Sequence, residues 1–129
     1  MWTNGVFDIL HKGLLELLKF AKQQGDKLIV GINSDASVKR LKGDDRPFNN
    51  AWVREQQLLQ LPWVDQVVVF EEDTPIDKLQ EYKPNVIVKG GDYTFDTVVG
   101  NDIAQVIIFP TVEGFSTSNI VEKVNGNKN

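Results

Sequence analysis

The stretch Thr3-Asn4-Gly5-Val6-Phe7-Asp8-Ile9-Leu10-His11-Lys12-Gly13-Leu14 organises the rest of the chain. A short extended piece runs into Gly5, and an apolar pattern with helical spacing begins near Leu14. Glycine has no Cβ, so the backbone at position 5 can approach a ligand closely. His11 stands just before the expected helix, whose first N–H groups are unpaired and carry partial positive charge. We therefore expect this stretch to hold a phosphate group.

Composition narrows the class of protein. The 129 residues fit one domain, and 41% hydrophobic with 25% charged residues is typical of a globular chain. A net charge of −4 argues against nucleic acid or an anionic membrane as a general partner. The absence of cysteine excludes disulfides and thiolate metal sites, and no apolar run approaches the roughly 20 residues of a membrane helix. No secretory signal is visible, so we expect a cytoplasmic protein.

Strand-length apolar runs alternate with amphipathic helical patterns along the whole chain. This alternation predicts a parallel α/β sheet with right-handed crossovers and ligands beyond the carboxyl ends of the strands. We expect a single domain over residues 1–129, with a frayed tail at 125–129 and a natural first strand that begins earlier. The expected strands are 2–4, 27–33, 64–70, 86–89 and 106–109, and the expected helices are 14–22, 35–41, 51–61, 75–82, a weak one at 95–104, and one opened by Ser116, Thr117 and Ser118 that ends near 124.

The opening stretch resembles the signature of the cytidylyltransferase-like nucleotidyltransferase superfamily, which reads roughly G-x-F-D-x-x-H-x-G-H. Five positions match, and Leu14 stands where the family has its second histidine; the matching residues are Gly5, Phe7, Asp8, His11 and Gly13. The resemblance extends over residues 3–124 and implies a Rossmann-like doubly wound sheet of about five strands with helices on both faces. One segment, residues 100–106, is shorter than in the heptose enzymes of the family.

Two further strings indicate a branch of that superfamily. Residues 33–44 are similar to bacterial heptose-1-phosphate adenylyltransferase domains, and residues 113–120 resemble the family motif E/D-G-x-S-T-T-x-I. The glycerol-3-phosphate cytidylyltransferase branch has an arginine before that motif, where this chain has Thr111 and Val112. The comparison therefore favours an adenylyltransferase, although the choice between ATP and CTP stays open.

The resemblance implies a set of functional residues. His11, Lys42 and Arg54 would be catalytic, and Asp35 and Lys39 would bind the acceptor substrate. Three of these assignments have an ordinary alternative: a loop histidine for His11, a solvated basic face for the lysines, and a surface arginine paired with Glu55 or Asp65 for Arg54. The expected nucleotide-binding residues are Thr3, Asn4, Gly5, Val6, Phe7, Asp8, His11, Gly13, Leu14, Lys42, Arg54, Lys89, Gly90, Gly91, Asp92, Ser116, Thr117 and Ser118.

The implied reaction joins a nucleoside monophosphate from ATP or CTP to a small sugar phosphate or polyol phosphate and releases pyrophosphate. Mg²⁺ would arrive with the triphosphate, without a metal site of the protein's own. A homodimer with Trp63-Val64-Asp65 at its interface is expected from the family, without nucleic acid or membrane partners. Leucine cannot donate a hydrogen bond, and losing one transition-state donor typically costs about 10²–10³ in kcat.

Two other functions compete with this enzyme. Because of Leu14, a nucleotide-binding or assembly module of the same fold with impaired catalysis is the first alternative. A dinucleotide-binding oxidoreductase is disfavoured, because no G-x-G-x-x-G follows an expected strand.

Overall fold

Five parallel strands and the helices that connect them form the framework of the protein. The computed structural model describes residues 1–91 and 93–109, and the backbone of 121–123. In chain order the elements are β1 (Trp2–Gly5), α1 (Lys12–Gln23), β2 (Ile29–Asn33), α2 (Asp35–Lys42), α3 (Ala51–Leu59), β3 (Gln66–Phe70), α4 (Ile76–Tyr82), β4 (Val86–Gly90), the 3₁₀ turn η1 (Phe95–Thr97), β5 (Gln105–Phe109) and β6 (Val121–Lys123).

The sheet has the order β3-β2-β1-β4-β5-β6. Strands β1 to β5 run parallel, and β6 pairs antiparallel with β5. The chain moves outward from β1 to β3 and then returns to the other side of β1 with β4. The strand order therefore reverses between β1 and β4, which is where open sheets of this kind bind ligands. The predicted Rossmann-like α/β sheet is confirmed.

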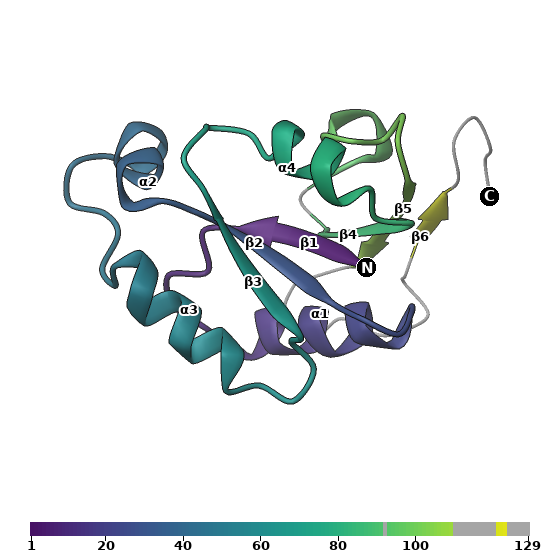
Figure 1. The fold of residues 1–129 in the computed structure, drawn as a ribbon, viewed down its shortest axis with the longest axis horizontal. Coiled ribbons are helices and arrows are strands. Elements are labelled where there is room, and N and C mark those ends of the chain that lie inside the picture. The colour runs from purple at the N-terminus through teal and green to yellow at the C-terminus, as the bar shows by residue number, and fades with distance from the viewer. Residues whose placement is uncertain (92, 110–120, 124–129) are drawn as a thin grey trace.

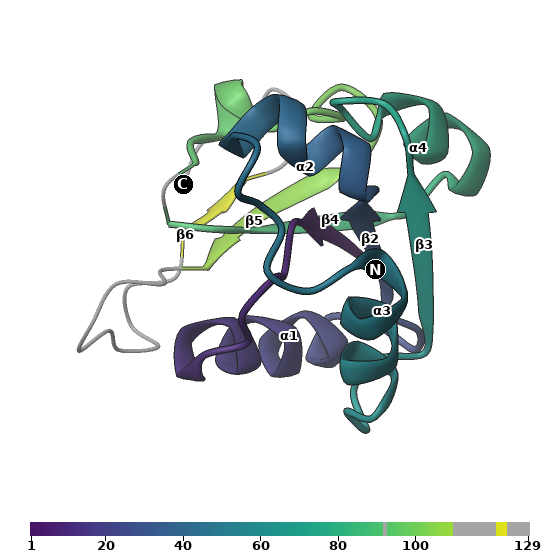
Figure 2. The same ribbon diagram turned by 90° about the vertical axis from the view of Figure 1, so that its left-hand side faces the viewer.

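Helices cover both faces of the sheet, as predicted. Figures 1 and 2 show α1 and α3 on one face and α2 and α4 on the other. Strand residues alternate between the two layers because successive side chains point to opposite faces. In β4, Val86 and Val88 pack in the core cluster that contains α1, whereas Ile87 packs with Leu79 of α4. Two buried cores result, one on each side.

Neighbouring strands β1 and β2 pack tightly beside Trp2, which is fully buried. Its indole packs over Gly31 of β2, where an added Cβ would lie only 2.5 Å from Trp2 Cζ2. A glycine is therefore required at this position of β2, because any larger residue would displace the indole from the core.

Local signals predicted several helix ends correctly. The Ser34 side chain caps α2 by accepting from the Ser37 N–H, and the Asn50 side chain caps α3 by accepting from the Val53 N–H. Pro75, expected as the first residue of α4, is instead its N-cap. The described helices include none long and apolar enough to cross a membrane.

Two predicted helices are wrong in their extent. The weak helix expected at 95–104 forms only the single 3₁₀ turn of η1. The last expected helix cannot reach 124, because the backbone of Val121–Lys123 pairs with Val106–Ile108 of β5. This pairing satisfies backbone groups that β5 would otherwise present at an open sheet edge. Ser116, Thr117 and Ser118, which were expected to open that helix, lie outside the described residues.

Candidate functional site

Two adjacent cavities open at the carboxyl ends of β1 and β4, at the point where the strand order reverses. The larger has a volume of about 640 Å³ and the smaller about 220 Å³. They share residues from β1, α1, β4 and the turn after β4: Asn4, Gly5, Val6, Leu14, Lys89 and Tyr93. The sequence-predicted stretch around Gly5 is therefore the wall between the two cavities.

The amino end of α1 opens onto the smaller cavity. His11 is its N-cap residue and lines the cavity, but its side chain makes no capping hydrogen bond within the described part of the chain. The first turn carries no acidic side chain. The first N–H groups of α1 therefore keep their partial positive charge, which favours an anion beside His11.

Thr3 adds a second polar group to the same cavity. Its hydroxyl oxygen is buried and has no hydrogen-bond partner among the described residues. The side chain lines the smaller cavity, and the residue is 1% exposed. Buried hydroxyls are nearly always hydrogen-bonded in native proteins. A polar ligand in the cavity would supply the partner that Thr3 lacks.

The turn that follows β1 has an unusual backbone. Phe7 has a φ of +51°, a left-handed conformation that bulky residues rarely adopt. Its ring lies against Gly5, where an added Cβ would be 3.3 Å from Phe7 Cε2. A side chain at position 5 would therefore press on the Phe7 ring. Gly5 also lines both cavities, where close approach of a ligand to its backbone stays an expectation.

The Asp8 side chain anchors the loop of residues 46–49. Asp8 is 4% exposed, and its carboxylate accepts hydrogen bonds from the backbone N–H groups of Phe48 and Asn49, at 2.6 and 2.8 Å. Arg46 Nε lies 3.6 Å from the same carboxylate. Among the described residues, Asp8 lines neither shared cavity. The structure therefore places the Asp8 side chain against residues 46–49 and not at the expected nucleotide site.

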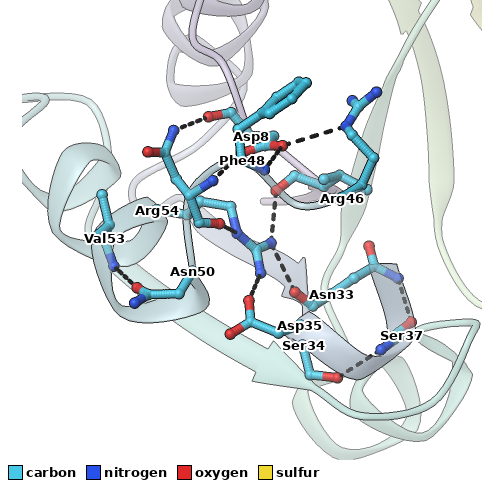
Figure 3. A network of polar contacts seen from close by, with 12 residues as sticks. Asp8, Asn33, Ser34, Asp35, Ser37, Arg46, Phe48, Asn50, Val53 and Arg54 are labelled. Carbon is cyan, nitrogen blue, oxygen red and sulfur yellow. Dashed lines mark hydrogen bonds and ion pairs between the residues drawn. The ribbon is translucent and has the colours of Figure 1, made fainter. Parts of the chain in front are cut away.

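Arg54 is also turned away from solvent. The residue is 0% exposed, and its guanidinium donates to the carbonyl oxygens of Val6, Asn33 and Asn49 at 2.8–3.0 Å (Figure 3). It also donates to the Asp35 carboxylate at 2.8 Å. Direct phosphate binding by Arg54 does not fit this geometry, because the donors already meet protein oxygens.

The alternative partners considered for Arg54 are also wrong. Its acidic partner is Asp35, which was expected to bind the acceptor substrate, and not Glu55 or Asp65. Asp65 instead pairs with Lys22 at 2.6 Å. The Asp35 side chain is 44% exposed, so part of it still faces solvent beside the ion pair.

The predicted lysines fall in different places. Lys42, at the end of α2, is exposed and lines the larger cavity. Lys39 is exposed one turn earlier and does not line either cavity in the described part of the chain. Lys89 is 6% exposed; its Nζ donates to the Asn4 carbonyl at 2.8 Å and lies 4.3 Å from the centre of the Tyr93 ring.

The remaining predicted residues are only partly placed by the structure. Gly90 lines the smaller cavity, while Gly13 lies in the first turn of α1 and Gly91 is exposed after β4. Asp92, Ser116, Thr117 and Ser118 lie outside the described residues. Over the described ranges, no three histidine, aspartate or glutamate side chains gather in a way that could hold a metal ion.

Several cavity residues were missed in the sequence. Most follow the carboxyl ends of strands β2 to β4, so the rule that ligands bind at those ends could have found them. Helices α1 and α2 and the segment after η1 supply the others, for which the sequence gives no comparable signal. The missed residues are Leu17, Asn33, Leu41, Phe70, Asp73, Thr74, Pro75, Tyr93, Val98 and Val99.

Comparison with known proteins identifies the family of this chain. The family model described as cytidylyltransferase-like matches residues 2–124. The "Bifunctional protein HldE" of Nitratiruptor sp. is 56% identical over 125 residues, which are 96% of this chain and 27% of that protein. The protein of the same name from Campylobacter jejuni is 50% identical over 99% of this chain and 28% of its own length. The chain thus spans little more than a quarter of these relatives.

A solved structure resembles the whole fold. The crystal structure of the lipopolysaccharide core biosynthesis protein from Thermoplasma volcanium aligns with a TM-score of 0.69 and 28% identity, covering 89% of this chain and 96% of that one. The resemblance found in the sequence is confirmed by both kinds of comparison. The chain belongs to the cytidylyltransferase-like family of nucleotidyltransferases.

Proposed function

We propose that this domain transfers a nucleoside monophosphate from ATP or CTP to a small sugar phosphate or polyol phosphate. The observation that carries the proposal is the open amino end of α1, with His11, at the mouth of the cavities between β1 and β4. The similarity of residues 33–44 to heptose-1-phosphate adenylyltransferase domains favours ATP and heptose 1-phosphate. Glycerol 3-phosphate with CTP is the second pair to test.

In this reaction an oxygen of the acceptor phosphate attacks the α-phosphorus of the nucleotide. The new phosphorus–oxygen bond forms as the bond to the bridging oxygen of the β-phosphate breaks, and pyrophosphate leaves. No covalent intermediate with the protein is required. The protein contributes positioning and charge stabilisation. We assign charge stabilisation to His11, the N–H groups at the start of α1, and the Lys42 ammonium.

We propose that Mg²⁺ is bound by the triphosphate itself. Asp73 is the one acidic residue among the described residues that line the two cavities, and its Oδ1 already accepts from Arg40 Nε at 2.8 Å. The described cavity walls otherwise offer amides, hydroxyls and cations, which suit phosphate oxygens better than a metal ion. When bound, Mg²⁺ supplies neutralisation of the charge on the transferred and leaving phosphates.

Leu14 favours a second candidate function, nucleotide binding or assembly with weakened catalysis. Its side chain lines both cavities, one turn from His11, where the family has a second histidine. An apolar side chain there leaves binding groups in place but removes a hydrogen-bond donor for the transition state. We therefore expect nucleotide affinity to be retained and turnover to be reduced.

We also propose that residues 1–129 act as one cytoplasmic domain that dimerises near Trp63-Val64-Asp65. This proposal rests on the family resemblance alone. Sedimentation of the chain across a range of concentrations would test it, and a monomer at all concentrations would contradict it.

The proposed function is tested by product formation. The chain is incubated with Mg²⁺ and ATP or CTP labelled at the α-phosphate, together with heptose 1-phosphate or glycerol 3-phosphate. We expect a labelled nucleotide sugar from ATP and heptose 1-phosphate, with equimolar pyrophosphate, and at least about 10²-fold less from the His11→Ala variant. Nucleotide binding without product from any pair would favour the binding module, and the absence of binding would contradict both functions.

A further inference from the structure

The left-handed turn at Phe7 is held from both sides by hydrogen bonds. The Val6 carbonyl, just before it, accepts from Arg54 Nη1 at 2.9 Å. The Asp8 carbonyl, just after it, accepts from Asn49 Nδ2 at 2.8 Å, and the Asp8 carboxylate accepts from two backbone N–H groups of the same loop. Strained backbone conformations persist only where surrounding contacts determine them. Arg54 and Asn49 supply those contacts here.

Arg54 links this turn to a second wall of the larger cavity. The Nη1 that reaches the Val6 carbonyl also donates to the Asn33 carbonyl at 2.8 Å, at the carboxyl end of β2 (Figure 3). Val6 and Asn33 both line the larger cavity. Arg54 Nε donates to the Asn49 carbonyl at 3.0 Å, which joins the two supports to each other. One buried cation thus bridges Val6, the residue after β1, and Asn33, the last residue of β2.

We infer that Arg54 and Asn49 are positioning residues that keep the Val6–Asp8 turn in its binding-competent shape without contacting the nucleotide. The inference rests on the proposed function of the cavities. If these supports were removed, Phe7 would relax toward negative φ, where a bulky residue has no steric penalty. The backbone at Gly5 and Val6 would then move, together with His11, which follows only three residues after Asp8.

The test uses Arg54→Lys, which keeps the charge but replaces the planar fork with a single ammonium. We expect kcat to fall about 10²-fold, the effect of a misplacement of roughly 1 Å at a reacting centre. The affinity for ATP and the affinity for AMP should weaken by equal factors, because the change removes no contact with the β- and γ-phosphates that only ATP carries. Leu58→Ala is the matched control: it lies one turn further along α3, is equally buried, and should lower thermal stability without lowering kcat.

Asn49→Ala provides a second variant that leaves the charge of Arg54 in place. It removes the hydrogen bond to the Asp8 carbonyl and should lower kcat in the same direction, by about 10-fold. If Arg54→Lys does not fold, this variant decides the question. Assays are run well below the unfolding temperature of every variant.

The outcomes separate this inference from the function on which it rests. An unmodified chain that neither binds ATP nor turns over would overturn both. An active unmodified chain with unchanged kcat in Arg54→Lys and Asn49→Ala would overturn the positioning role alone. A loss of ATP affinity in Arg54→Lys with unchanged AMP affinity would show direct contact with the β- and γ-phosphates and would also overturn it.

Discussion

Leu14 lies in the first turn of α1, where its side chain contributes to both cavities at the switch point of the sheet. His11 lies one residue before the helix, so both side chains are placed by the same helix start. The family's second histidine would stand at position 14 and would face the same space. We therefore propose that the identity of this one residue affects catalysis, although Leu14 also packs against the core.

Replacing Leu14 with histidine should restore a missing donor. We expect Leu14→His to raise the rate of pyrophosphate release by about 10²–10³, because preorganised donors act mainly on the transition state. Nucleotide affinity measured by calorimetry should change little. Lys12→His serves as the control, since it adds an imidazole at an exposed neighbouring position that is not among the described cavity residues. Equal turnover in Leu14→His and the unmodified chain would count against this account.

For single residues, the sequence predicts position at the site better than it predicts the role of the side chain. Three motif residues, Gly5, Phe7 and His11, line the cavities, because their spacing relative to a strand and a helix start is local information. The roles of Asp8 and Arg54 were not predictable, because their partners are backbone atoms 40 and 48 positions away, at Phe48 and Val6. A polar residue near a motif has the same appearance in a sequence whether it faces a ligand or the interior.

At the scale of elements, Asp65 joins the end of α1 to the start of β2. Its carboxylate accepts from Lys22 Nζ at 2.6 Å and from the Leu28 N–H at 2.7 Å. The hydrogen bond from Lys22, followed by that from the Leu28 backbone, lowers the pKa of Asp65 below its ordinary value of 3.8. The folded state therefore releases this proton more readily than the unfolded state does.

This lowered pKa gives a pH-dependent stability. The contribution of Asp65 is complete above pH 3.8 and is lost as the pH falls through the lowered pKa of the folded state. Asp65→Asn should cost about 1 kcal/mol in the free energy of unfolding at pH 7, the upper end for an exposed pair. The difference should shrink in acid. Urea unfolding of the unmodified chain and of Asp65→Asn at pH 7 and pH 3 measures this loss of stability. Asp26→Asn, at an exposed position, is the control. An equal loss at both pH values would contradict the lowered pKa of Asp65.

Elements were predictable where the signal is local. The caps at Ser34 and Asn50 and the hydrophobic period of α1 lie within a few residues of the helices that they define. The pairing of β6 with β5 was not predictable, because three residues carry no period and the partner strand lies beyond 110–120 in the chain. The contact between Gly5 and the ring of Phe7 was likewise not predictable, because it depends on the left-handed backbone of Phe7.

At the scale of the whole molecule, alternation of strands and helices was enough to predict the fold. Right-handed crossovers on a parallel sheet restrict the possible topologies to a few. The order β3-β2-β1-β4-β5 places the reversal between β1 and β4, and the two cavities lie there. The location of the candidate site was therefore predictable, whereas the shape of its far wall also depends on Val98 and Val99, which follow no strand and have no comparable signal in the sequence.

The central claim is that the backbone amides at the start of α1 and the His11 imidazole bind the phosphates of a nucleotide. A crystal structure of the chain soaked with ATP and Mg²⁺ tests it most directly. We predict phosphate oxygens within about 3 Å of the first N–H groups of α1 and of the His11 ring, with the base toward Gly90. A nucleotide bound elsewhere, or an empty helix mouth at millimolar ATP, would contradict the claim.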